Sequence, residues 1–246
     1  MRAWTELLKF GRTDMVNNKW EPYLKLDTNG LPCMAQQTYE PLVSSDGKTF
    51  CKNYSFPNEY QYMNSADRPL YTTEVVNWFW SNELMWIEHF KDKPYAPEIL
   101  DIDLINKRIY IKWYTESCNQ IIYSGKDWPQ QHWRKQIRDI IVDQYNEGVY
   151  KLTMYPYCHY ISDDGNMRAI DWYGCVPVND PYIEEKYMQG IIHETAQFRL
   201  DETGKPLDGK LNLEMMFERS LSTHVMWGNH NMNYIYDEIF TRVTNA

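Results

Sequence analysis

Asp171 closes a short predicted hairpin and is the acidic residue best placed to do chemistry. The turn Asp164-Gly165-Asn166 needs positive φ, which Gly and Asn adopt at least cost, and it separates the predicted strands 160–162 and 167–170. We therefore expect Asp171 at the end of the second strand, pointing out of the sheet edge. A carboxylate in that place can hold a hard cation against phosphate oxygens. An ordinary surface hairpin is the alternative.

Lys52 is the basic residue whose neighbours predict a special environment. It follows Phe50 and Cys51 on the predicted strand 49–54. A lysine on an inner strand must extend its amine to water or find an anionic partner. The alternative is a strand alternation that exposes Lys52 to water.

Glu83 lies within the apolar stripe of a predicted helix that Thr72 or Thr73 can cap. The stripe recurs at helical spacing and comprises Val75, Val76, Phe79, Trp80, Leu84 and Ile87. A buried carboxylate needs a cationic partner or a shifted pKa, and Lys52 is the nearest candidate. The alternative is a glutamate at the edge of the stripe that reaches solvent.

These residues need an antiparallel sheet and several helices to position them. Strands are predicted over 20–26, 38–43, 49–54, 98–103 and 108–114, and hairpin turns separate several of them. Besides the helix that carries Glu83, helices are predicted over 2–10, 128–146, 182–199, 211–225 and 232–243. The sequence thus predicts an α+β chain with its strands mostly in the first half.

Composition narrows the classes of partner and site. The chain has 246 residues and a formal charge of -9, which argues against nucleic-acid binding and fits a protein partner better. Its five cysteines form no Cys-x-x-Cys pair, which argues against a disulfide framework or a zinc site. No apolar run is long enough for a membrane helix and no signal-peptide pattern is present, so we expect a cytoplasmic protein without a membrane contact.

In order and spacing, these residues resemble the protein-kinase superfamily. Asp171-Trp172-Tyr173-Gly174 is similar to the Asp-Phe-Gly motif, with the glycine one place late, and Lys52 and Glu83 are similar to the strand lysine and helix glutamate. The resemblance implies a two-lobed fold: an N-lobe over 1–114 with an antiparallel five-stranded sheet and one long helix, a hinge over 115–118, and a reduced, mostly helical C-lobe over 119–246. It also implies ATP and Mg²⁺ as cofactors, with Lys52, Glu83 and Asp171 at the nucleotide and Asp171 on the metal.

The catalytic loop departs from the kinase pattern. Counting back from Asp171, the family's proline falls on Pro156, but its catalytic Asp falls on Thr153 and its metal-binding Asn on Cys158. Threonine is no carboxylate base near neutral pH, and a thiol suits Mg²⁺ poorly. The phosphate-binding Gly-x-Gly is also missing, because only Asn29-Gly30-Leu31-Pro32 lies between the first two strands.

Three functions follow as alternatives. The first is a pseudokinase, a kinase-like binding module whose nucleotide site is kept partly or only as a scaffold. The second is an atypical ATP-dependent transferase that moves phosphate or, as selenoprotein-O type pseudokinases do, an AMP group. The third is an unrelated α+β interaction protein.

Overall fold

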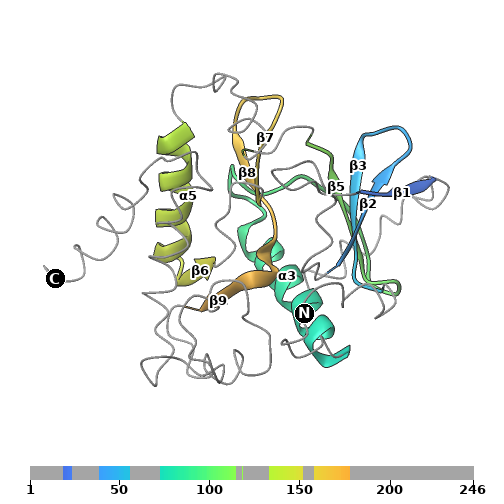
Figure 1. Cartoon of the computed structure of the whole chain (residues 1–246). Helices are drawn as coiled ribbons and strands as arrows, with labels where there is room; N and C mark the ends of the chain where they lie inside the picture. The colour runs from blue at the N-terminus through green and yellow to red at the C-terminus, as the bar shows by residue number, and fades with distance from the viewer. Residues whose placement is uncertain are drawn as a thin grey trace, which may run out of the picture. The chain divides into compact units, whose positions relative to one another are not determined.

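The computed structural model describes residues 19–23, 39–55, 73–114, 118, 133–151 and 158–177 (Figure 1). The chain divides into two compact units. The first contains residues 1–80 and 97–114, and the second contains residues 81–96 and 115–246. Helix α3 (Thr73–Phe90) contributes its first half to one unit and its second half to the other.

A five-stranded antiparallel sheet forms the body of the first unit (Figure 1). Its strands lie in the order β1-β2-β3-β5-β4, and the chain leaves β3 through α3 before it returns as β4. Their bounds are β1 Trp20–Pro22, β2 Glu40–Ser44, β3 Thr49–Asn53, β4 Ile99–Asp103 and β5 Arg108–Lys112.

Short polar turns set the register of this sheet. Between β2 and β3, Gly47 has φ +68°, a left-handed conformation that glycine adopts without steric cost. The Asp46 carboxylate accepts hydrogen bonds from the Ser44 hydroxyl and the Lys48 amide at 2.6 and 3.1 Å. These contacts hold Phe50 opposite Val43 in the neighbouring strand β2.

Alternation along the strands gives the sheet two different faces. One face carries a small core of Leu42, Cys51 and Tyr110, against which Trp20 and Leu100 pack. The other face carries Lys52 and the aromatic residues two positions before and after it, Phe50 and Tyr54.

The second unit combines helices with short strands. Besides the end of α3, it contains helix α5 (Trp133–Asn146), whose buried residues are Trp133, Ile137, Ile140, Ile141 and Gln144. Strands β7 (His159–Ile161) and β8 (Met167–Ala169) form a hairpin, and β6 (Val149–Lys151) pairs with β9 (Cys175–Pro177). The short 3₁₀ helix η3 (Trp172–Gly174) joins the hairpin to β9.

The predicted α+β class, the five-stranded antiparallel sheet and the long helix between its third and fourth strands are confirmed. No strand was predicted at β6, and residues 175–177 were expected to be loop and instead form β9. A three-residue strand is too short to show periodicity, so only the pairing with β6 reveals it.

Several predictions fall on residues outside those described. They are the helices over 2–10, 182–199, 211–225 and 232–243, and the hinge residues 115–117. Within the described part of the chain, no helix has the length and apolar character needed to cross a membrane.

Candidate functional site

Lys52 lies in the middle of the first unit's sheet. Its side chain is 1% exposed, which excludes the alternative that strand alternation turns it to water. The amine lies 4.6 Å from the centroid of the Tyr39 ring. A cation over an aromatic face is attracted by the ring quadrupole, more strongly where water is excluded. Tyr39 therefore helps to stabilise the buried charge of Lys52.

Glu83 lies on the half of α3 that belongs to the second unit. It is 1% exposed, so the alternative of a solvent-facing glutamate is also excluded. Its Oε1 accepts a hydrogen bond from the backbone N–H of Trp172 at 3.3 Å. Glu83 thereby contacts the residue directly after Asp171. The ion pair between Lys52 and Glu83 stays a prediction, since the two residues belong to different units.

Asn82 is a site residue that the sequence analysis missed. Its Nδ2 donates to the carbonyl oxygens of Tyr173 and Cys175, both at 2.8 Å, and its Oδ1 accepts from Trp86 Nε1 at 3.1 Å. Asn82 is 7% exposed, so these bonds form away from bulk water. Its signal in the sequence was the same as that of Glu83, a polar residue within a buried helical stripe.

Asp171 adopts a backbone conformation that is rare for residues other than glycine. Its φ and ψ are 63° and 55°, in the left-handed region, and its side chain is 1% exposed. That Asp171 points out of the sheet edge stays a prediction, and its burial excludes the alternative of an ordinary surface hairpin at this residue. Aspartate tolerates this region better than most residues, and such conformations cluster at functional sites.

Trp172 anchors the segment that follows Asp171. It is fully buried and stacks on Phe90 and Tyr95, with ring centroids 4.8 and 6.1 Å apart. Its indole Nε1 donates to the carbonyl of Ala169 at 3.0 Å. The amine of Lys151, also buried, lies 5.9 Å from the Trp172 ring. These contacts fix the start of η3 and hence the position of Asp171.

The hairpin turn before Asp171 is held by side-chain bonds to the backbone. Gly165 has φ +78°, as predicted for this turn, and the amide of Asn166 donates to Asp164 Oδ1 at 2.9 Å. The Ser162 hydroxyl also donates to Asp164. These two bonds, that of Ser162 first, hold the pKa of Asp164 well below its ordinary value.

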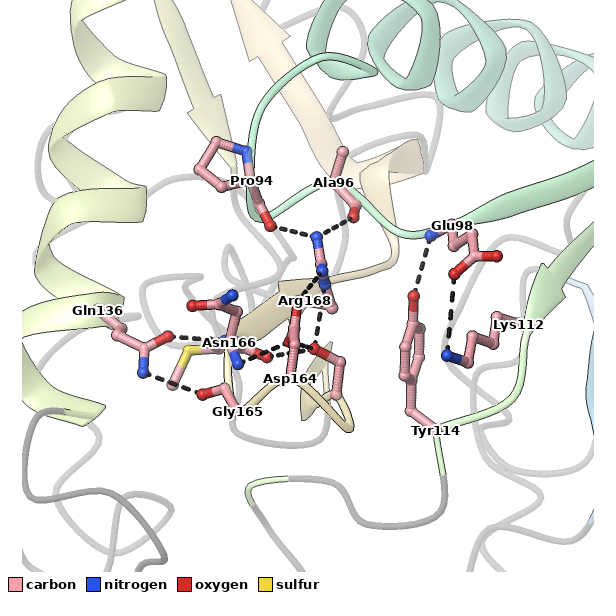
Figure 2. Close-up of polar contacts among 12 residues, drawn as sticks. Pro94, Ala96, Glu98, Lys112, Tyr114, Gln136, Asp164, Gly165, Asn166 and Arg168 are labelled. Atoms are coloured by element: carbon pink, nitrogen blue, oxygen red, sulfur yellow. Dashed lines mark hydrogen bonds and ion pairs between the residues drawn. The ribbon is translucent and has the colours of Figure 1, made fainter.

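Arg168 ties this hairpin to the loop that follows α3, as Figure 2 shows. One terminal nitrogen of its guanidinium donates to the carbonyl of Pro94 and, at 3.4 Å, to that of Ala96. The other donates to Asp164 Oδ2 at 2.7 Å, and Nε donates to Ser162 Oγ at 3.2 Å. Arg168 therefore joins two segments of the second unit that are about 70 residues apart in sequence.

A second polar cluster ties the same loop to α5. The Lys93 amine contacts Asp143 and Glu147 at 2.9 and 2.8 Å, and the Tyr95 hydroxyl donates to Asp143 Oδ2 at 2.6 Å. Burial, followed by this bond to Asp143, raises the pKa of Tyr95 far above its ordinary value. The Tyr95 ring that stacks on Trp172 is thus anchored through its hydroxyl.

The residue at the family's metal-binding Asn position suits Mg²⁺ poorly. The carbonyl of Cys158 accepts the N–H of Ile170 at 2.9 Å, so the residue at the family's metal-binding Asn position lies beside the Asp171 segment. Its side chain is a buried thiol, a soft donor, whereas Mg²⁺ prefers oxygen. Among the described residues, no three His, Cys, Asp or Glu side chains gather as a metal site would require. Thr153 and Pro156 lie outside the described residues.

Comparisons with known proteins give a distant likeness only. No protein-family model matches the chain, and no curated protein matches it. Monomeric WbdD has 11% identity and a TM-score of 0.46, over 81% of this chain and 47% of that one. A high-resolution WbdD structure has 11% identity and a TM-score of 0.45, over 89% of this chain and 49% of that one.

A third similar structure is described as the bifunctional kinase-methyltransferase WbdD. It has 12% identity and a TM-score of 0.45, over 90% of this chain and 51% of that one. The chain thus spans about half the length of these proteins. The fold assignment rests on the order of elements within the units and not on this likeness.

That order follows the expected pattern in the described residues. Lys52 lies on the third strand, Glu83 on the helix that follows it, and Asp171 directly after a hairpin in the second unit. Protein kinases carry their phosphate-contacting lysine, its glutamate partner and their metal-binding aspartate on elements in the same order. The described elements accordingly follow the order of a protein-kinase-like fold.

Proposed function

We propose that this kinase-like protein is a pseudokinase, a binding module that does not transfer phosphate. The observation that carries the proposal is Cys158, whose carbonyl bonds to the N–H of Ile170 and whose side chain is a soft thiol at the position where the kinase pattern has a hard donor to the metal. Thr153 at the catalytic-base position agrees with it, because losing a general base costs on the order of 10²–10⁴ in rate. In this reading Glu83 and Asn82 serve to hold the segment after Asp171.

The partner of such a module would be another protein. The formal charge of -9 disfavours a phosphate backbone and favours a partner with a basic surface. This part of the proposal is tested by affinity capture at low and high salt, since screening weakens attraction between exposed charges. A partner that binds equally well at both salt concentrations would contradict the proposal that charge attraction drives the binding.

Label transfer from ATP tests the main proposal. The protein is incubated with a host-cell lysate and ATP labelled at the α or γ phosphate, with Mg²⁺ or Mn²⁺. We expect no label on any protein beyond that seen with Asp171→Asn, the matched control. Transfer that disappears in both Lys52→Ala and Asp171→Ala would overturn the proposal.

One observation favours the atypical transferase instead. Asp171 is held in a left-handed conformation, and strained backbone at a buried acid is often part of a catalytic mechanism. If this alternative holds, α label marks AMP transfer and γ label marks phosphate transfer. The same experiment therefore separates the two transferase chemistries from each other and from the pseudokinase.

A further inference from the structure

The sheet face that carries Lys52 is lined by aromatic side chains. Alternate residues of a strand point to the same face, so Phe50 and Tyr54 flank Lys52 on that face. Phe50 and Tyr54 are each 2% exposed and Lys52 is 1% exposed. Along its own strand, the buried amine is thus bordered by a ring on each side.

Neighbouring strands add further rings to the same face. Phe50 is paired with Ile111 across β3 and β5, so Trp113, two residues after Ile111, shares this face. The Trp113 and Phe50 rings are stacked, with centroids 5.2 Å apart and planes at 24°. Tyr23 packs edge-on against both, at 4.8 Å from Trp113 and 6.0 Å from Phe50. These three rings therefore pack on one another as a single group.

Tyr39 completes the set by covering the lysine itself. Its ring lies 4.6 Å from the Lys52 amine and contacts Tyr54 and Phe50, with ring centroids 5.6 and 6.3 Å away. Tyr39 is 4% exposed. The Tyr39 ring therefore covers one side of the Lys52 amine.

From this packing we infer that the aromatic cluster of Tyr23, Tyr39, Phe50, Tyr54 and Trp113 excludes purine nucleotides from the Lys52 face, and that Phe50 is the residue that decides it. In protein kinases the corresponding lysine contacts the nucleotide phosphates, so base and ribose must lie over neighbouring positions of the same face. Two residues before that lysine the kinase pattern Val-Ala-x-Lys has alanine, where this chain has Phe50. The phenyl ring and its partner Trp113 fill the volume that alanine would leave.

This inference rests on the kinase-like fold and deepens the proposed function, because it explains why the retained lysine would not bind ATP. Transfer chemistry and nucleotide exclusion are separate properties. A protein could bind ATP without turnover, which would leave the pseudokinase proposal intact and overturn this inference alone. Conversely, ATP-dependent labelling that needs Lys52 and Asp171 would overturn both.

Calorimetry and thermal-shift measurements with ATP, ADP and adenosine, with and without Mg²⁺, test the inference. We expect no saturable binding by the wild type up to millimolar ligand. Phe50→Ala removes the ring and opens the face, so we expect it to bind at least one of the three ligands at least tenfold more tightly than the wild type. Tyr110→Ala is the matched control, since it removes a buried ring from the opposite face of the same sheet. This control is expected to bind none of them.

Two further variants keep the test decisive if Phe50→Ala does not fold. Phe50→Val keeps part of the volume, and Trp113→Leu removes the stacked partner while leaving Phe50 in place. Circular dichroism and a cooperative melt establish folding for each variant. Saturable ATP binding by the wild type below millimolar ligand overturns the inference whatever the variants do. Folded variants at position 50 or 113 that all fail to bind overturn it equally.

Discussion

In the first unit, Lys52 is buried among aromatic rings, whereas in the second unit the segment after Asp171 is held by hydrogen bonds to its backbone as well as by a stacked ring. A ring contact has weak directional preference and is worth about 0.5–1.5 kcal/mol beyond the area it buries. A hydrogen bond to a charged group contributes about 1.5–3 kcal/mol and is lost when its geometry changes. The two regions therefore differ in what specifies them.

The difference bears on function. Stacked and edge-on rings fill the space beside Lys52, and we infer that their shape limits what can approach the lysine. Around Asp171, the bonds from Asn82 and to Glu83 fix where the backbone runs, so position is specified more tightly than shape. If aromatic rings fill the sheet face beside Lys52 while Asp171 keeps its position, the protein would retain the kinase-like arrangement of elements without binding a nucleotide.

Removing the ring of Trp172 gives the largest effect and tests how far packing also supports the second unit. Trp172→Ala deletes a fully buried side chain that stacks on Phe90 and Tyr95. We expect a loss of about 3–5 kcal/mol in the free energy of unfolding, measured by urea denaturation. Trp172→Phe keeps a ring in the stack and is expected to lose clearly less. A loss below about 1 kcal/mol for the alanine variant would mean that hydrogen bonds alone hold this segment.

How much of this could be predicted from the sequence depends on the length of each signal. Helix α3 and strands β2 to β5 follow clear periodic patterns, whereas the apolar neighbours of Lys52 and Glu83 left both burial and exposure open until the structure showed burial. The stacking of Phe50 on Trp113 could not be predicted, since it depends on the pairing of β3 with β5. Alternation assigns a residue to a face but does not say which strand lies beside it.

The contacts of the second unit were still harder to predict. Arg168 and Asn82 bond mainly to backbone carbonyls, which every residue has, so no spacing of residue types marks the partners. The left-handed conformation of Asp171 was also invisible, because aspartate does not require it as glycine often does. Sequence reasoning found the charged residues and missed most of the polar groups that position them.

Replacing Arg168 sharpens the contrast between directional bonds and packing. Arg168→Met keeps most of the apolar stem but removes the donors to Pro94, Ala96 and Asp164 (Figure 2). The substitution removes the charged donor and leaves its acceptors without that hydrogen bond. We therefore expect a loss of about 1.5–3 kcal/mol in the free energy of unfolding. Hydrogen exchange at the Ala169 amide, which donates to Tyr95, should also become faster.

Lys112→Met is the matched control for this substitution. Lys112 contacts Glu98 at 3.9 Å, and both side chains are more than a third exposed (Figure 2). Exposed ion pairs contribute about 0–1 kcal/mol, so the control should change stability little. Equal losses in the two variants would show that removal of any cation, and not the bonds made by Arg168, explains the effect.

The smallest expected effect concerns pH and the hairpin turn. Bonds from the Ser162 hydroxyl and then the Asn166 amide lower the pKa of Asp164 in the folded protein below its unfolded value. A lowered folded pKa contributes stability that is fully present above the unfolded value, about 3.9, and is lost as the pH falls through the folded value. We therefore expect the wild type to exceed Asp164→Asn in urea midpoint by a constant amount between pH 5 and 7. That margin should shrink as the pH is lowered from 4 toward 2. A margin that does not change over this range would mean that backbone bonds hold the turn and that the charge of the Asp164 carboxylate adds no stability. One of the directional contacts that distinguish the second unit from the first would then be lost.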